Sequence, residues 1–170
     1  LWSKFNPGQI EGMQKLLDSP EHEGIEHEGD DAGQTKFFSQ LSRTLFNSHT
    51  LDESTLRRYD RNIVRYWEQI TEARNEQHNS KLNLKYFQYL SLLFTEYYLD
   101  HFFNHQQQML IELNDAVAAY NTGKSDSEIL KPYNAEDLNK IAYWSATGSG
   151  KTLLMHVNIL QYQYYIEKAG

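Results

Sequence analysis

The sequence predicts a mostly helical fold, in which a helical bundle leads into the first strand–loop–helix unit of an α/β lobe. Apolar residues recur at helical spacing through most of residues 8–120. Residues 84–104 are apolar nearly all round, which is typical of a helix in the middle of a bundle. A short apolar run at residues 141–144 precedes a loop rich in Gly and Ser, and a further helical pattern follows that loop.

The first part of the chain reads as successive helices joined by polar connections. Asp52 is the expected N-cap of a long helix that ends near His78, and Thr50 is the competing choice. Gly123 is the expected C-cap of the last helix in this part, and a polar linker follows it. The spacing predicts helices over residues 8–18, 34–46, 52–78, 84–104 and 109–120.

An acidic loop is predicted between the first two helices, over residues 19–33. It contains a tandem repeat, Glu21-His22-Glu23-Gly24 and Glu26-His27-Glu28-Gly29. The histidines and carboxylates could hold a metal ion, or the segment could be a solvated acidic loop. We favour the second interpretation, because two histidines five residues apart share a face of neither a helix nor a strand.

An arginine stripe marks the outer face of the long third helix. Two interpretations stay open. The guanidinium groups could contact a nucleic-acid backbone, with neighbouring aromatic rings stacking on bases. They could instead pair with glutamates of the same helix, which is the outcome we expect. The stripe comprises Arg57, Arg58, Arg61 and Arg65, and the glutamates are Glu68, Glu72 and Glu76.

The most informative segment reads Ser145-Ala146-Thr147-Gly148-Ser149-Gly150-Lys151-Thr152. Its two glycines permit a backbone nest of N–H groups, which opens onto a helix N-terminus and favours a phosphate chain. Lys151 can reach the β- and γ-phosphates of ATP, and we assign it the catalytic role. The Thr152 hydroxyl is the expected ligand of Mg²⁺. The predicted nucleotide-binding set in this loop is Thr147, Gly148, Ser149, Gly150, Lys151 and Thr152.

The flanks of this loop have the context that a phosphate-binding loop requires. Ile141 to Trp144 reads as a short buried strand, and Leu153 to Glu167 reads as a helix. A chance match in a flexible linker is the alternative, and the apolar flanks argue against it. The first loop position is Ser145, where the general pattern has Gly.

The loop with its flanks, residues 138–165, resembles motif I of superfamily 2 helicases of the DEAD/DEAH type. It is most similar to the restriction (helicase) subunit of type III restriction enzymes, although family members usually have Met or Ala where this chain has Ser145. The resemblance implies a RecA-like α/β lobe over residues 125–170, preceded by a helical region over residues 1–124. It implies an ATP-dependent helicase or translocase that acts on nucleic acid, with DNA expected, in restriction or antiviral defence.

The resemblance also bears on adenine recognition and on turnover. Many superfamily 2 motors read adenine with an aromatic residue upstream of the loop, and Tyr133 is placed for this role. A plain helix entry is the alternative, because Asn134 follows where the family has Gln. The family's acidic box, coupling motifs and arginine finger have no counterpart in residues 1–170. We therefore expect an ATP hydrolase in a longer polypeptide, and no activity from these residues alone.

Composition limits the other function classes. The formal net charge of −7 argues against a broad phosphate-binding surface. Cysteine is absent, which excludes disulfides and cysteine metal sites. We expect no membrane contact, because no long uncharged apolar run is present. We expect a cytoplasmic location, since a reducing compartment is compatible with the absence of cysteine. Two alternatives to a helicase stay open: another kind of P-loop NTPase, or a helical module that docks a methyltransferase or another defence subunit.

Overall fold

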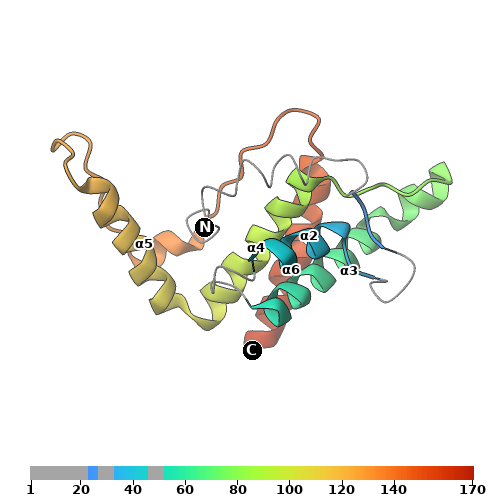
Figure 1. Cartoon of the computed structure of the whole chain (residues 1–170), viewed down its shortest axis with the longest axis horizontal. Helices are drawn as coiled ribbons and strands as arrows, with labels where there is room; N and C mark the ends of the chain where they lie inside the picture. The colour runs from blue at the N-terminus through green and yellow to red at the C-terminus, as the bar shows by residue number, and fades with distance from the viewer. Residues whose placement is uncertain (1–22, 27–32, 46–51) are drawn as a thin grey trace.

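The computed structural model describes residues 23–26, 33–45 and 52–170, and within these ranges the chain is mostly helical. The helix predicted at residues 8–18 and most of the acidic loop lie outside the described residues. Figure 1 shows the order of the elements. They are α2 (Lys36–Leu45), α3 (Glu53–His78), α4 (Tyr86–Asn104), α5 (Gln106–Asn121), the 3₁₀ helix η3 (Ala135–Asn139) and α6 (Lys151–Ala169).

Helix α3 begins where the sequence predicts. Asp52 is its N-cap, and one carboxylate oxygen accepts a hydrogen bond from the Thr55 backbone N–H at 3.0 Å. Hydrogen bonds from Ser54 and Thr55 lower the pKa of Asp52 to about 2. The helix ends after His78, where Asn79 takes the left-handed conformation with φ of 46°. The predicted N-cap and end of this helix are therefore confirmed.

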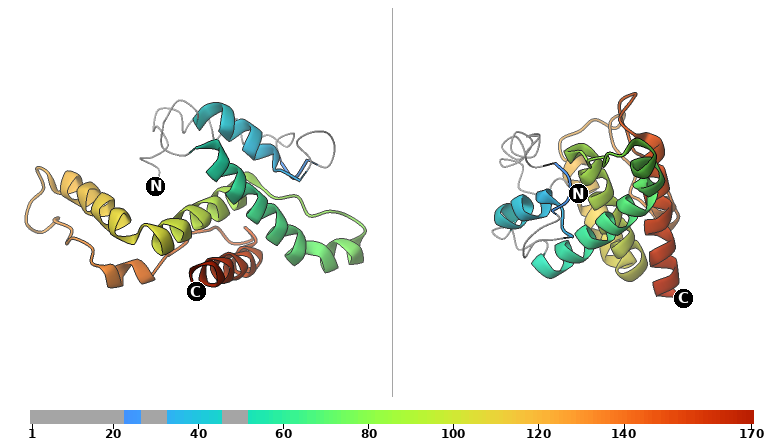
Figure 2. Two further views of the ribbon diagram at one scale, coloured as in Figure 1. Left: turned by 90° about the horizontal axis from the view of Figure 1, so that it is seen from below. Right: turned by 90° about the vertical axis from the view of Figure 1, so that its right-hand side faces the viewer.

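The core lies where α2, α3, α4 and α6 meet. Helix α6 packs against both α3 and α4, and the views in Figure 2 show it running beside α4. The loop helix is thus part of the same bundle as the helices of the first part, although the division at residues 124 and 125 stays a prediction. The largest fully buried side chains are Trp67, Tyr59, Tyr89, Tyr165, Phe37, Leu41, Leu56, Ile63, Leu84, Leu92 and Leu93.

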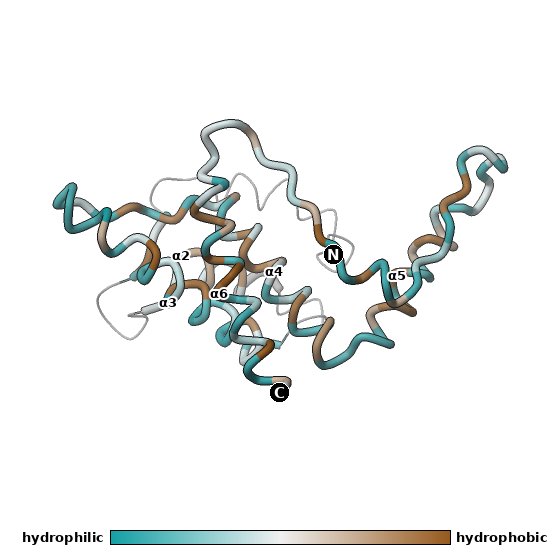
Figure 3. The backbone as a smooth tube through the Cα atoms, turned by 180° about the vertical axis from the view of Figure 1, so that it is seen from behind, coloured by the Kyte–Doolittle hydropathy of each residue, from teal (hydrophilic) through white to brown (hydrophobic). Residues whose placement is uncertain are grey.

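Helix α5 leads away from this core. It follows α4 after a bend at His105, and only Met109 and Val117 on it are buried. The chain returns along it, because the Asn114 side chain bonds both backbone groups of Tyr133 and η3 packs against the helix. In the hydropathy view of Figure 3, apolar and polar stretches alternate along α5 as it projects from the bundle.

The described residues 23–26 and 33–35 lie on the bundle. Ile25 and Thr35 form an isolated antiparallel bridge. The buried Asp60 carboxylate accepts hydrogen bonds from the backbone N–H of Thr35 at 2.9 Å and from its hydroxyl. Burial raises the pKa of Asp60 to about 6. Glu23 forms an ion pair with Lys85. Both histidines of the tandem repeat lie outside the described residues, so the structure does not test a metal site there.

The predicted strand at residues 141–144 does not form, and the described part of the chain contains no strand beyond the isolated bridge. These residues are also not buried: Ile141 is 44% exposed, Tyr143 38% and Trp144 89%. A strand exists through hydrogen bonds to a neighbouring strand, and none is available here. The fold class is therefore correct for the helical part and wrong for the strand–loop–helix unit.

Candidate functional site: the loop at the start of α6

The loop before α6 has the backbone shape that its glycines predict. Gly148 and Gly150 have φ of 80° and 83°, in the left-handed region that residues with a Cβ atom rarely adopt. Gly150 is the N-cap of α6, which begins at Lys151. The unpaired N–H groups of the first helical turn therefore face the loop, together with the positive end of the helix dipole.

The charged group of this site lies over the loop itself. The Lys151 ammonium donates hydrogen bonds to the backbone carbonyls of Ser145 at 3.2 Å and Ala146 at 3.3 Å. The Lys151 side chain is exposed, and so are Thr147 and Thr152. The loop thus concentrates a positive charge and an accessible hydroxyl at one helix N-terminus, which is an arrangement that suits a phosphate chain with a divalent cation.

Gln88 fixes the loop to α4. Its side-chain N–H donates to the Ser149 carbonyl at 2.9 Å, and its oxygen accepts from the Lys85 backbone N–H at 3.0 Å. A Cβ atom at Gly150 would lie only 2.7 Å from the Gln88 amide nitrogen, so a side chain there would displace the Gln88 amide as well as strain the backbone. The Ser149 hydroxyl is buried and has no hydrogen-bond partner among the described residues.

The chain from η3 to the loop runs antiparallel to α4. Three side chains on one face of α4 hold it: Tyr98 donates to the Leu138 carbonyl, the Thr95 hydroxyl shares a hydrogen bond with the Tyr143 hydroxyl, and Gln88 bonds Ser149. Because side chains of a helix hold this segment, its position does not depend on a sheet. The loop is therefore supported by the bundle at both ends.

Two open pockets flank this segment where it meets the loop. The first, of about 450 Å³, lies between the start of α4 and residues 143–149. The second, of about 700 Å³, extends along α6 and includes Lys151. Ser91, Tyr143 and Ser145 line both. Among the described residues, no Asp or Glu lines either pocket.

The other side of α6 is held by a buried polar cluster. Glu96 of α4 accepts hydrogen bonds from the Gln161 amide at 2.9 Å and the Tyr165 hydroxyl at 2.8 Å, both on α6. It also accepts one from the Asn62 amide of α3 at 3.1 Å. Burial raises the pKa of Glu96 to about 7, and these hydrogen bonds only partly oppose that rise. The cluster therefore joins α3, α4 and α6 around a single carboxyl group.

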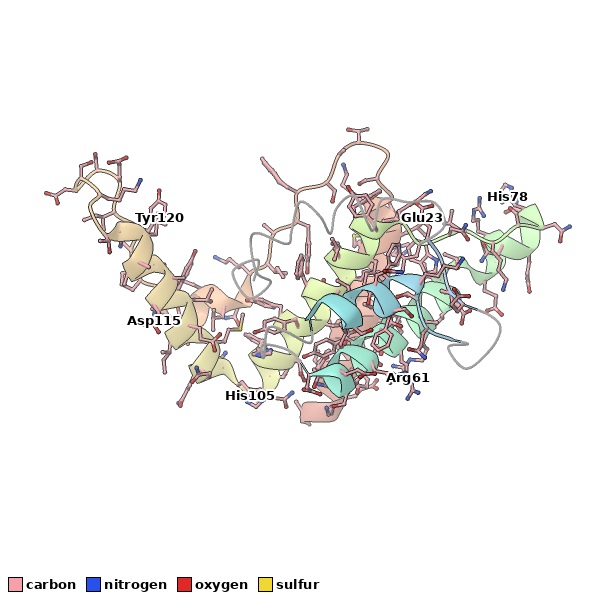
Figure 4. The ribbon with its side chains drawn as sticks, in the orientation of Figure 1. Glu23, Arg61, His78, His105, Asp115 and Tyr120 are labelled. Carbon is pink, nitrogen blue, oxygen red and sulfur yellow. The ribbon has the colours of Figure 1, made fainter. Side chains whose placement is uncertain are left out.

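Two arginines of the stripe form ion pairs, but with other partners than the predicted glutamates. Arg58 donates to both carboxylate oxygens of Asp100 on α4, and Arg57 bonds Glu53. Burial opposes ionisation of Asp100, yet the hydrogen bonds from Arg58 and Tyr59 lower its pKa. Arg61, labelled in Figure 4, is exposed on α3.

Tyr133 lies against α5 and not beside the loop. Its backbone is bound to Asn114 on α5, and it lines neither of the two pockets beside the loop. Its ring is 45% exposed. The assignment of Tyr133 to adenine stays a prediction from the sequence, whereas residues 147–152 lie together at one helix end.

Sequence reasoning missed the residues of α4 that face the loop. Gln88 and Phe87 stand in a stretch read only as the apolar helix at the middle of the bundle. A polar amide one turn into such a helix is a signal that could have identified Gln88, because a buried amide needs partners. No sequence signal separates Phe87 from the other rings of this helix.

Comparison of the chain with protein-family models, with curated proteins and with solved structures gives no match. The resemblance to superfamily 2 helicases and to the type III restriction subunit is contradicted by the fold. Such a lobe requires a strand directly before the loop, and residues 141–144 form none. The assignment of residues 147–152 to a nucleotide stays a prediction from the sequence.

The described residues also bear on other classes of site. No helix there combines the length and the apolar character needed to cross a membrane. Within the same residues, no cluster of three or more His, Cys, Asp and Glu side chains is placed to bind a metal ion.

Proposed function

We propose that the chain binds the phosphate chain of a nucleoside triphosphate such as ATP, together with Mg²⁺, at residues 147–152. The observation that carries the proposal is the position of Lys151, whose ammonium lies over the loop at the N-terminus of α6, between the carbonyls of Ser145 and Ala146. A phosphate oxygen would replace those carbonyls as the partner of the ammonium, and the α6 N–H groups would complete the contact.

Each loop residue has a role in this proposal. Gly148 and Gly150 let the backbone N–H groups turn inward, and Lys151 supplies the charge. Thr152 fits a Mg²⁺ ion, because its hydroxyl is exposed in the first turn of α6. Mg²⁺, when bound, would neutralise charge on the phosphate oxygens.

Hydrolysis needs more than the loop provides. Phosphoryl transfer depends on groups that position the metal and the attacking water, and neither loop pocket has a carboxylate in its walls. We therefore propose binding for residues 1–170 and no steady turnover. A motor on DNA, a methyltransferase partner and a cytoplasmic location stay predictions from the sequence.

Nuclear magnetic resonance of the ¹⁵N-labelled chain tests the proposal. Titration with Mg²⁺ and tripolyphosphate should shift the amide signals of residues 147–152. Lys151→Ala should weaken binding at least about tenfold, because a hydrogen bond to a charged group is lost. Lys168→Ala is the matched control, since Lys168 is an exposed lysine in the last turn of the same helix. Unchanged loop signals, or equal binding by the Lys151→Ala variant, would refute the phosphate site.

A further inference from the structure

An aromatic pocket opens directly beside the loop. It has a volume of about 450 Å³, within the usual range for small-molecule sites. Rings from two parts of the chain form it: Tyr86, Phe87 and Phe94 on α4, and Tyr143 and Trp144 on the segment that leads into the loop. Loop residues Ser145, Ala146 and Ser149 close its near end. A molecule held by the loop could therefore extend into the pocket without leaving the protein surface.

Two rings of this pocket are exposed, whereas Tyr86 and Phe94 are partly buried against the core. Phe87 is 41% exposed and Trp144 is 89% exposed. Tyr143 is held in place, because its hydroxyl is hydrogen-bonded to Thr95. Large exposed rings grouped around a hollow are a common sign of a binding site, since isolated apolar surface residues do not form such a group.

The chemistry of the walls favours a flat, neutral, aromatic ligand. Among the described residues no Asp, Glu, Lys or Arg lines the pocket, and its polar side-chain groups are the hydroxyls of serine and tyrosine and the indole N–H of Trp144. Heterocyclic bases stack on aromatic side chains with little dependence on sequence, because every base has a π-face. The loop supplies charge for phosphate, and the pocket supplies rings for a base.

We propose that this aromatic pocket binds the base of the nucleotide whose phosphates lie at the loop, an inference that rests on the proposed function. The larger groove along α6 is the competing position for the base. It includes Lys151, but aliphatic side chains such as Met155 and Ile159 form much of its length along the helix. The aromatic pocket has five rings beside the loop, whereas that groove has only Tyr143 and Tyr162.

The two halves of a nucleotide separate the two proposals experimentally. Adenosine carries the base without phosphate, and tripolyphosphate carries phosphate without the base. Titration of the ¹⁵N-labelled chain with adenosine should shift signals at residues 86–94 and 143–144, and tripolyphosphate should shift those at 147–152. Adenosine should also quench the fluorescence of the exposed Trp144, so quenching should be smaller in Trp144→Phe, which keeps Trp2 and the buried Trp67.

Substitutions provide the matched comparison. Phe87→Ala should weaken adenosine and ATP at least about fivefold and leave tripolyphosphate unchanged, as expected for the loss of one stacking ring. Lys151→Ala should weaken tripolyphosphate binding and leave adenosine binding unchanged. Tyr120→Ala is the control, because that ring is 51% exposed at the far end of α5, away from the loop (Figure 4).

Each outcome decides between the proposals. Tripolyphosphate binding without adenosine binding would overturn the base pocket and leave the phosphate site standing. Adenosine shifts at Met155 and Ile159 would place the base in the groove along α6 and also overturn it. Failure of both ligands would refute the proposed function, and the base pocket with it. An equal effect of Phe87→Ala on tripolyphosphate would show that Phe87 supports the loop rather than a base.

Discussion

The buried face of α6 and its N-terminal end differ in how the protein holds them. Towards α3 and α4, Leu154 and Val157 are buried in the core, and Gln161 and Tyr165 bond Glu96. At the N-terminus, the loop is exposed and is held to α4 chiefly through Gln88. The buried face fixes the helix within the bundle. The N-terminal end leaves backbone N–H groups and Lys151 available to a ligand. This is the usual division between a rigid scaffold and the loop that it positions.

The loop is therefore positioned without a sheet. In α/β proteins a strand positions such a loop. Here the packed helix α6 and side chains of α4 position it. The position of the site then depends on the stability of the bundle, and the shape of the site depends on local contacts of the loop. Substitutions on the buried face of α6 and substitutions in the loop should therefore affect different measurements.

The largest effect is expected from removal of the central carboxyl group on the buried side. Glu96→Ala leaves Asn62, Gln161 and Tyr165 without their shared acceptor and opens a cavity, so the free energy of unfolding should fall by about 3 to 5 kcal/mol. Glu96→Gln keeps the shape and an acceptor oxygen and should cost about 1 kcal/mol. Urea denaturation at pH 4.5, where Glu96 is protonated in the folded chain, measures both losses by circular dichroism. Equal losses in the two variants would mean that the hydrogen bonds of Glu96 do not hold the helices together.

The next effect concerns pH. Glu96 has a pKa of about 7 in the folded chain against 4.5 for an ordinary glutamate, so the folded state retains a proton that the unfolded state has already lost. Stability should therefore fall as pH rises from 4.5 to 7, by on the order of 3 kcal/mol from this group. Asp60, with a pKa of about 6 against 3.8, acts with the same sign in a lower window.

Glu96→Gln isolates the contribution of Glu96 to this profile. The difference in unfolding free energy between wild type and variant should change between pH 4.5 and 7 and stay constant above that range. Asp100 does not interfere there, because its lowered pKa affects stability only at more acidic pH. Parallel profiles for the two proteins would contradict the raised pKa of Glu96.

The helices and the loop could be predicted from the sequence because their signals are local. Asp52 caps its helix through neighbours three residues away, and the glycines of the loop set their own backbone conformation. The strand at residues 141–144 was predicted wrongly, because its apolar run says nothing about whether a neighbouring strand is present. The Gln88 contact and the partner of Arg58 could not be predicted either, since they join residues 61 and 42 positions apart.

The smallest effect on stability is expected from the exposed end, where two glycines form a matched pair. Both Gly148 and Gly150 have positive φ, but an added Cβ atom meets nothing within 4 Å at Gly148 and lies 2.7 Å from the Gln88 amide at Gly150. Gly148→Ala should therefore lower the free energy of unfolding by about 1 kcal/mol from backbone strain, and Gly150→Ala by about 2 kcal/mol. Because the excess arises from Gln88, a double-mutant cycle with Gln88→Ala should remove it. Purely additive losses would show that an added Cβ atom at residue 150 does not disturb Gln88.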